Sequence, residues 1–585
     1  MFLQFIPCLL WFFILSFGLA WPLAARLRID PAEKLVATVV LSLFGTYLIT
    51  FAIYVLRLPA VAYWILPLLA AAGIVAGRRA LVDTLRDADA RALVIGQLLV
   101  SGWSLGWLGL VVSYSGGGWA GDWYEHWVRA LFFLEHWPLD TQFLGIYALP
   151  ARPPLANLVT GGLLAITPAR FAHFQLFTLL LNSLAFLPAG LLARRFAPAG
   201  FRTAAIGLIA LGLMLNPSFM ENSTFTWTKL FTVVFILSGL YFFLRTLDPD
   251  SPRSAGPLCA LALAAGILAH YSAAPYVLVL AVAWLFLNRA RWTMAAFWRQ
   301  TALLGGIGAL VLATWFGWSL ATYGAHTTLL SNSSVTVEDA RKGNQLLKVA
   351  LNLRDTVVPH FLRPLDGLLI AQQDPCGYWR DWLFQLYQLN LFFVFGSVGW
   401  LVLGRELLRA WSATPGRGRW FWLFFSVSVI VLGVAVHGAR DTWGLAHICL
   451  QSLVVLGLAG LAARWSLLTP GWRRLLAAGA GIDFFLGIAL QFFAESQTPD
   501  LGILRGERPP AILQFNGAAL MNLAGKTQHG LAFFGAASGL SRPVLLVLLA
   551  VMLGLALAWL HRLTRRSVVA GGRDNFSPAP ESSRQ

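Results

Sequence analysis

The chain has 585 residues, of which 58% are hydrophobic and only 12% are charged. Soluble domains carry about 25% charged residues, so this composition excludes a soluble enzyme. The formal net charge of +17 is spread over short connectors between apolar runs, a pattern that argues against nucleic-acid binding.

Apolar runs of about 17 to 25 residues recur along almost the whole chain. Because a bilayer offers no partner for free backbone amides, each run is predicted to be a helix. We therefore expect an all-α, polytopic integral membrane protein with roughly 14–16 transmembrane helices and amphipathic juxtamembrane helices. The expected spans are 2–20, 35–56, 60–77, 92–113, 171–193, 203–216, 225–246, 257–270, 273–288, 300–320, 383–404, 420–436, 443–463, 474–494 and 542–562.

The connectors between these runs predict the orientation of the chain. Basic residues collect in alternate connectors, for example around Arg78 and Arg194, and such short basic loops stay cytoplasmic. The run 153–168 does not fit this alternation as a full crossing, so we interpret it as a short or partly inserted helix. Long outward loops are where a functional site is expected. These loops are 114–152, 321–382 and 495–541.

The first outward loop contains the densest polar cluster outside the connectors, in the run GDWYEHWVRALFFLEHW. Asp122 and Glu125 are three residues apart, and Arg129 follows one turn later. A helix that begins near Asp122 therefore places all three on one face. Two interpretations are open at this point: the acids cap and solvate a helix at the membrane interface, or they belong to a catalytic site.

Three further elements follow this loop in a recognisable order. Arg152-Pro153-Pro154-Leu155 opens the next apolar run, and Ala193-Arg194-Arg195-Phe196 and the stretch 211–217 come after it. With Asp122 at the end of a transmembrane span, this order resembles the GT-C membrane glycosyltransferases. The closest patterns are those of the protein O-mannosyltransferases and the aminoarabinose transferases. The resemblance covers roughly residues 100–320.

This resemblance implies a GT-C-like fold and an inverting transfer of a sugar from a polyprenyl-phosphate donor at the outer face of the membrane. It also implies that Asp122 is the general base on the acceptor hydroxyl and that Arg152 contacts the lipid phosphate. A leaving phosphate needs fixed positive charge in a site shielded from water, and a planar guanidinium suits it. The alternative for Arg152 is a side chain that snorkels to the interface.

The sequence departs from the aminoarabinose transferase pattern at the second acid, because Lys229 stands about where that acid would be. Glu221 is the carboxylate available in that stretch, as a catalytic acid or as a helix cap. A metal site bridged by two acids is thus in doubt, and a divalent metal, Mg or Mn, stays an open cofactor. A lysine inside a membrane is costly unless partnered, so Lys229 is predicted to contact phosphate, with snorkelling as the alternative. The catalytic candidates are Asp122, Glu125 and Glu221.

Further substrate-binding candidates lie downstream, each with a simpler alternative. His270 and Tyr271 lie at the outer end of a span, where such residues are more often packing residues. His360 and Arg363 in the middle loop close over the donor or end a solvated loop. Arg440 is a second phosphate contact or part of a local ion pair.

Asp483 lies inside an apolar span, AAGAGIDFFLGIALQFF. Acids within membrane helices mark transport or proton pathways as often as catalysis. The small residues beside it, 478–481, favour close helix packing instead. Asp483 is therefore the main support for a rival function.

Together these features predict an integral membrane glycosyltransferase of the bacterial plasma (inner) membrane, with its active site facing the periplasm or exterior. Its partners would be a polyprenyl-phosphate-sugar donor, a glycan, lipid or protein acceptor, and membrane lipids. The alternative is a transporter or flippase of lipid-linked saccharides or small molecules. The expected parts are N-terminal transmembrane helices in 1–91, a GT-C-like catalytic module in 92–320, an outward loop with an amphipathic helix in 321–382, C-terminal transmembrane helices in 383–565 and a disordered cytoplasmic tail in 566–585.

Overall fold

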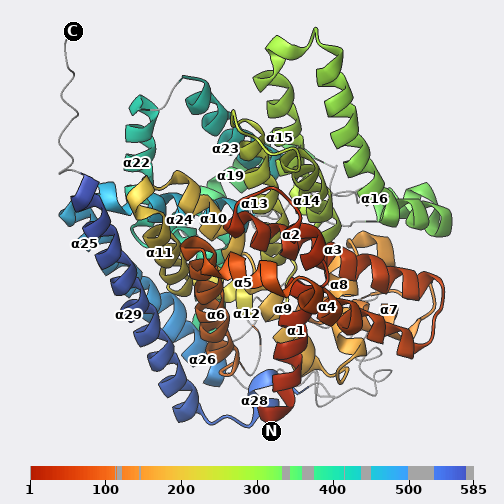
Figure 1. Cartoon of the computed structure of the whole chain (residues 1–585). Helices are drawn as coiled ribbons and strands as arrows, with labels where there is room; N and C mark the ends of the chain where they lie inside the picture. The colour runs from red at the N-terminus through yellow and green to blue at the C-terminus, as the bar shows by residue number, and fades with distance from the viewer. Residues whose placement is uncertain are drawn as a thin grey trace.

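The computed structural model describes residues 2–111, 114, 122–143, 147–331, 343–358, 375–413, 416–436, 450–497 and 532–574. Over these residues the regular structure is helical, apart from one isolated bridge between Phe143 and Tyr147. This confirms the predicted all-α class. Figure 1 shows the helices gathered into one body, with α29 along one edge and α16 along the opposite one.

The N-terminal half of the chain runs through sixteen labelled α-helices. They are α1 (Ile6–Gly18), α2 (Trp21–Ala25), α3 (Pro31–Val55), α4 (Ile65–Ala76), α5 (Arg78–Arg86), α6 (Ala88–Leu108), α7 (Asp122–Glu135), α8 (Leu155–Ala165), α9 (Phe171–Ser183), α10 (Phe186–Phe196), α11 (Arg202–Met214), α12 (Pro217–Thr224), α13 (Lys229–Thr246), α14 (Ala255–Ala269), α15 (Ala274–Leu287) and α16 (Ala295–Leu330).

The described helices of the C-terminal half are shorter and more often interrupted. They are α19 (Gln345–Val357), α20 (Pro375–Leu389), α21 (Leu391–Val394), α22 (Gly399–Ala413), α23 (Gly416–Val436), α24 (Leu450–Arg464), α25 (Pro470–Ile482), the π-helix η10 (Asp483–Leu490), α26 (Gln491–Gln497), α28 (Phe534–Ser538) and α29 (Arg542–Asp574). Three 3-10 turns matter below: η4 (Leu149–Ala151), η6 (Tyr271–Ala273) and η7 (Arg289–Arg291).

Several of these helices are long enough to cross a bilayer. Within the described ranges, nine helices have the length and apolar composition of a span, or up to eleven if each of two bent pairs is one span. The bent pairs turn by 66° between α4 and α5 and by 71° between α11 and α12. The shorter apolar helices α14 and η6–α15 account for two other expected crossings, and α8 is the short helix expected in 153–168. The chain is therefore a multi-pass membrane protein.

Burial separates a central set of helices from a lipid-facing set. The most apolar window of the α9–α10 unit is wholly buried inside the protein, and that of α13 is 89% buried. The corresponding windows of α16 and α29 are only 17% buried, although both are strongly apolar. A helix that is apolar all round and mostly exposed suits contact with lipid tails rather than water.

Glycines allow α29 to pack closely on α6. A Cβ atom added to Gly102, Gly106 or Gly109 would lie 2.6–2.7 Å from side-chain atoms of Met552, Leu549 and Leu545, respectively. Small residues in membrane helices permit such close backbone approach, which gains van der Waals contact. This contact holds the otherwise exposed C-terminal helix against the body.

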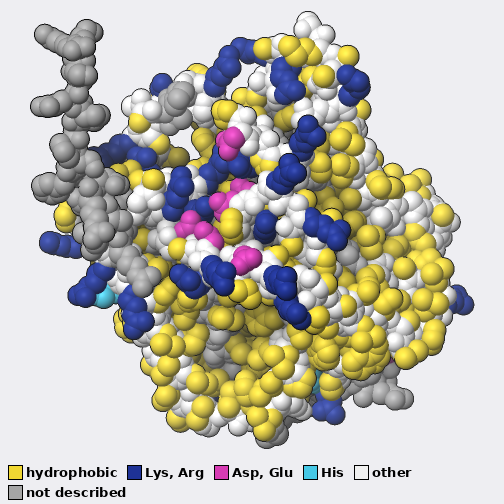
Figure 2. Space-filling model, in the orientation of Figure 1, with side chains coloured by type: hydrophobic (Ala, Val, Ile, Leu, Met, Phe, Trp, Pro, Cys, Tyr) yellow, Lys and Arg dark blue, Asp and Glu magenta, His cyan; other side chains and the backbone are white. Residues whose placement is uncertain are grey.

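The basic connectors also carry structural ion pairs at one end of the body. Arg194 at the end of α10 donates to Asp89 at 2.6 Å and to Asp30 at 2.8 Å, and Arg195 donates to Asp248 at 2.7 Å. These bonds tie α10 to the starts of α3 and α6 and to the end of α13. Figure 2 shows the result on this face, where acidic side chains gather within a wider surround of Lys and Arg.

Two predicted segments differ from expectation, and a third agrees with it. The expected span 383–404 is broken into α20, α21 and α22, with Gly396 at φ 91° between the last two. The run 153–168 forms only the short helix α8, as expected of a short or partly inserted helix. Helix α29 continues to Asp574, so the tail predicted as disordered from 566 begins as helix. Residues 575–585 lie outside the described residues.

Candidate functional site

Helix α7 begins at Asp122, where the spacing predicted a helix start, but it does not lie on the surface. Glu125 and Arg129 are fully buried, and Glu125 Oε1 accepts from Arg129 Nε at 2.8 Å. Trp127 is also fully buried. For Glu125, the interpretation as an acid that solvates an interfacial helix is therefore wrong. Residues 125–133 of α7 are all buried, so its ionic face turns into the protein.

Arg129 connects α7 to the segment that carries Arg152. Its Nη1 donates to the carbonyl of Leu149 at 2.7 Å and its Nη2 to that of Ala148 at 3.4 Å. Its guanidinium also lies 4.1 Å from the centroid of the Phe143 ring. A bidentate guanidinium holds several acceptors in fixed geometry. The Glu125–Arg129 pair therefore positions the turn η4, which immediately precedes Arg152.

The environment of Glu125 sets its protonation state. Burial favours the neutral acid, but the charges of Arg152 and Arg129 outweigh burial and lower the pKa of Glu125 to about 2. An effective general base has a pKa near the working pH, so this carboxylate is a weak base at neutral pH. Glu125 is therefore better suited to hold Arg129 and Arg152 in place than to accept a proton.

Arg152 lies at the rim of this buried pair. Its Nε is 3.4 Å from Glu125 Oε2, and its guanidinium is 5.3 Å from the centroid of the Tyr147 ring. The side chain is 16% exposed, in contrast to the wholly buried Arg129. The guanidinium is thus held in place from one side while part of its surface stays accessible, which is the geometry that a ligand contact requires.

The α14–α15 link reaches the same segment from the other side. The Tyr271 hydroxyl donates to the carbonyl of Pro150 at 2.9 Å, and His270 Nδ1 accepts from the Ser272 amide at 3.1 Å. Burial, together with the nearby charges of Lys229 and Arg152, lowers the pKa of His270 well below its usual value. His270 is therefore neutral and stands within electrostatic range of both cations.

Lys229 is the first residue of α13 and is 5% exposed. Its Nζ lies 4.2 Å from the centroid of the Trp227 ring, a cation–π contact. A snorkelling lysine keeps its ammonium group in water, so the snorkelling alternative does not fit this buried side chain. The structure thus brings Lys229, Arg152, His270, Tyr271 and Glu125 into one region.

Glu221 does not cap the short helix α12. The cap is Asn216, whose Oδ1 accepts from the Phe219 amide at 2.9 Å. Glu221 lies inside the helix and is 2% exposed. The helix-cap alternative for Glu221 is therefore wrong.

Asp483 stabilises the break between α21 and α22. Its carboxylate accepts from the Ser397 amide at 3.0 Å and from the Tyr387 hydroxyl at 3.3 Å. Ser397 Oγ in turn donates to the carbonyl of Gly479 at 3.1 Å. A broken membrane helix frees backbone amides that must find partners inside the protein. These contacts give Asp483 a local structural role at the broken helix.

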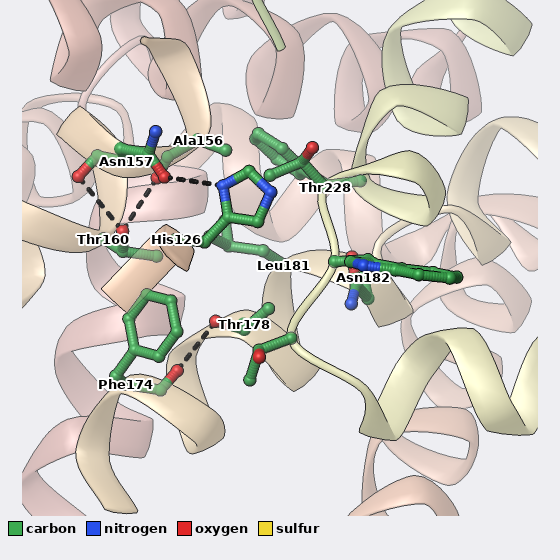
Figure 3. A pocket seen from close by; sticks show the side chains of 12 residues that line it. His126, Ala156, Asn157, Thr160, Phe174, Thr178, Leu181, Asn182 and Thr228 are labelled. Atoms are coloured by element: carbon green, nitrogen blue, oxygen red, sulfur yellow. Dashed lines mark hydrogen bonds between the residues drawn. The ribbon is translucent and has the colours of Figure 1, made fainter. Parts of the chain in front are cut away.

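A small polar cavity lies beside Lys229, between α7, α8, α9 and the segment before α13. Its volume is only about 10 Å³, about the space of one water molecule. Figure 3 shows His126 in its wall, between Asn157 and Thr228. His126 Nδ1 is 3.1 Å from Asn157 Oδ1, and burial lowers the pKa of His126 to about 4. Among the described residues, Thr228 Oγ1 and Asn182 Oδ1 have no hydrogen-bond partner.

Sequence reasoning did not single out these cavity residues. His126 directly follows Glu125, and Asn157 lies two residues after the Arg-Pro-Pro-Leu element. Asn182 is a polar residue in the middle of an apolar run. A buried amide or imidazole in a membrane helix is a signal of function or of a packed polar contact. The sequence shows three polar residues in or beside apolar runs, but only the structure shows that they are buried around one cavity.

Several predicted candidates cannot be placed. His360, Arg363 and Arg440 lie outside the described residues. Asp122 begins α7, but its side chain is outside what the structure describes. In the described ranges, no group of three or more His, Cys, Asp or Glu side chains could hold a metal ion.

The comparisons with known proteins give no sequence relative and a distant structural likeness. No family model matches the chain, and no curated protein matches it. ArnT from Cupriavidus metallidurans bound to undecaprenyl phosphate is similar at 14% identity and a TM-score of 0.44, covering 81% of this chain and 77% of that one. Its apo state is similar at 14% identity and a TM-score of 0.43, covering 72% and 75%.

Proposed function

We propose that the protein is an inverting membrane glycosyltransferase that transfers a sugar from a polyprenyl-phosphate donor to an acceptor at the membrane face opposite the basic connectors. The observation that carries this proposal is that Arg152 and the buried Lys229 both lie within electrostatic range of His270, in a region reached from α7 on one side and from the α14–α15 link on the other. Asp122, which begins α7, lies one helical turn before Glu125.

The charges of this site suit a departing phosphate. Two cations, Arg152 and Lys229, stand in largely buried surroundings, where electrostatic stabilisation of a developing anion is strongest. Neutral His270 adds no competing charge to them. The Glu125–Arg129 pair and the Tyr271 hydrogen bond hold the Arg152 segment, so little reorganisation is needed when the donor binds.

The reaction is a single displacement. The acceptor hydroxyl oxygen attacks the anomeric carbon of the sugar, and the bond from that carbon to the phosphate oxygen breaks. The acceptor proton passes to the Asp122 carboxylate, and the polyprenyl phosphate leaves with its charge facing Arg152 and Lys229. Attack opposite the leaving group inverts the anomeric centre.

A two-acid metal site does not fit this chain well. Lys229 stands where the resemblance places the second acid, and Glu125 is engaged by Arg129 and Arg152. A positive side chain at that point takes over part of the charge neutralisation that a divalent ion would supply. No step of the proposed reaction therefore passes through Mg or Mn.

The proposed partners and location follow the same chemistry. The acceptor is a glycan, lipid or protein, and the donor reaches the site from the surrounding membrane lipids. The proposed location is the bacterial plasma (inner) membrane, with the site toward the periplasm. The alternative function, a transporter or flippase, rests on Asp483. Its carboxylate accepts a hydrogen bond from the Ser397 amide at the break between α21 and α22.

Transfer of label from a radioactive polyprenyl-phosphate sugar tests the proposal. Purified protein is incubated with a panel of such donors and with membrane extract as acceptor. Asp122→Asn is expected to lower transfer by about 100-fold or more, because a positioned base contributes that much. Asp140→Asn, the same substitution at an exposed position of the same loop, is the matched control. Equal transfer by wild type and Asp122→Asn would overturn the assignment of the base.

A further inference from the structure

An apolar groove opens between α14, α15 and α16, away from the site described above. Its volume is about 490 Å³, and its lining is apolar or small apart from two threonines. The Thr301 hydroxyl accepts from Trp284 Nε1 at 3.1 Å, and the Thr246 hydroxyl donates to the carbonyl of Phe243. Both hydroxyls are thus satisfied within the protein, which leaves a surface suited to a hydrocarbon chain.

The groove occupies one end of its helices. On α14 it extends from Gly256 to Ile267, and on α16 from Thr301 to Leu312. At about 1.5 Å per residue, each stretch is about 16 Å long. The hydrocarbon core of a bilayer is about 30 Å thick, so the groove has the depth of one leaflet. It begins at the end of α14 and α16 that carries the basic connectors.

Positive charge surrounds the mouth of the groove. Arg253 lies two residues before α14, Arg289 and Arg291 form η7 directly after α15, and Arg299 lies near the start of α16. Figure 2 shows Lys and Arg side chains around the tip of the α15–α16 hairpin. In the part of the chain that the structure describes, none of these four arginines forms an ion pair. The nearby Asp248 is paired with Arg195 and Arg245.

The same mouth carries the marks of a membrane interface. Trp292 and Trp298 are 44% and 49% exposed beside the arginines. Tryptophan rings prefer the level of the lipid headgroups, so this tip lies where a headgroup would meet the groove. Basic pockets between membrane helices on the cytoplasmic side bind the headgroups of anionic lipids.

We propose that this groove binds an anionic phospholipid of the leaflet that faces the basic connectors. One acyl chain lies between α14, α15 and α16, and the headgroup phosphate lies among Arg253, Arg289 and Arg299. The one-leaflet depth and the position of the arginines favour a phospholipid over the donor, whose phosphate is proposed to lie near Lys229. The proposal goes beyond the transferase activity and does not depend on it.

Two glycines of α16 provide a matched pair of variants. A Cβ atom at Gly308, which lines the groove, or at Gly306, which does not, would meet no other atom within 4 Å. A side chain at Gly308 therefore starts into the groove without a clash at its Cβ atom, so Gly308→Phe is designed to fill the groove, and Gly306→Phe adds the same bulk at a position that does not line it. Both proteins are purified from nanodiscs that contain equal amounts of phosphatidylglycerol and phosphatidylcholine. Native mass spectrometry then counts the retained lipids.

The wild type and Gly306→Phe are expected to retain one phosphatidylglycerol with at least tenfold preference, and Gly308→Phe is expected to lose it. A variant with Arg253, Arg289 and Arg299 all changed to Gln, at exposed positions that leave the packing intact, is expected to bind both lipids equally. Equal retention of both lipids by the wild type would overturn the proposal. Equal loss in both Phe variants, or displacement of phosphatidylglycerol by added undecaprenyl phosphate, would also overturn it.

Discussion

Glu125 and Arg129 form a wholly buried ion pair one turn apart on α7, with 2.7 Å between Glu125 Oε1 and Arg129 Nη2. Removing one partner of a buried pair leaves the other charge uncompensated, which costs about 3–5 kcal/mol. We therefore expect Glu125→Ala to lower the thermal midpoint of the purified protein strongly, and Glu125→Gln to lower it less. Glu135→Ala, at an exposed position on the same helix, is the control. A midpoint for Glu125→Ala equal to that of the control would contradict the buried pair.

The same pair predicts how stability depends on pH. The pKa of Glu125 falls from 4.5 to about 2 in the folded protein, because Arg152 and Arg129 outweigh the effect of burial. Its stabilising contribution is therefore complete above about pH 5 and is lost as the pH falls toward 2. The wild-type midpoint is expected to drop more than that of Glu125→Gln between about pH 5 and pH 3. If the thermal midpoints of the two proteins change in parallel with pH, the pKa of Glu125 is not lowered in the folded protein.

Tyr271 is expected to act on the reaction by positioning Arg152. Tyr271→Phe removes the hydrogen bond to the carbonyl of Pro150 and leaves that acceptor unpaired. The loss of such a bond costs about 1 kcal/mol, so the KM for the donor is expected to rise about fivefold while kcat changes less. Tyr323→Phe, which removes a similar bond to the carbonyl of Leu139, is the control. A fall in kcat without a change in KM would point to a different role.

The sequence predicted the local features of this site better than its burial. The start of α7 at Asp122 and the shared face of Glu125 and Arg129 follow from helical spacing within one run. The amphipathic pattern could not show that the ionic face turns inward, because the covering groups, such as the carbonyls of Leu149 and Pro150, come from other elements. Burial of this kind depends on tertiary packing.

The polar cavity and the broken helix could not be predicted from the sequence either, because both depend on tertiary packing. The cavity joins His126, Asn157 and Asn182 from three helices, and each residue alone resembles an ordinary polar residue in an apolar run. Asp483 meets Ser397 across 86 residues of sequence. The break at Gly396 could have been suspected from the glycine, but the carboxylate that satisfies the freed amide could not have been named.

Lys229 is expected to bind the donor phosphate. Lys229→Met removes a charge that is worth about 1.5–3 kcal/mol in a hydrogen bond to an ionised group, so affinity for polyprenyl phosphate should fall about 10- to 100-fold. Lys229→Arg keeps the charge and is expected to retain part of the affinity. Binding is measured by quenching of tryptophan fluorescence, with Lys348→Met on α19 as the control. Unchanged affinity in Lys229→Met would remove this residue from the site.

Asp483 separates the structural interpretation from the transport hypothesis. If its task is to accept from the Ser397 amide, then Asp483→Asn keeps an acceptor at that point and should retain most of the stability and of the transferase activity. Asp483→Leu leaves the Ser397 amide without that acceptor and is expected to cost about 1–3 kcal/mol, because an unsatisfied buried group bears the full desolvation penalty. A proton or ion pathway requires a group that can bind and release a proton. An amide cannot do this, so Asp483→Asn would then lose activity. Thermal midpoints and label transfer for the two variants, measured together, decide the question, and an Asp483→Asn protein that is stable but inactive would favour the pathway.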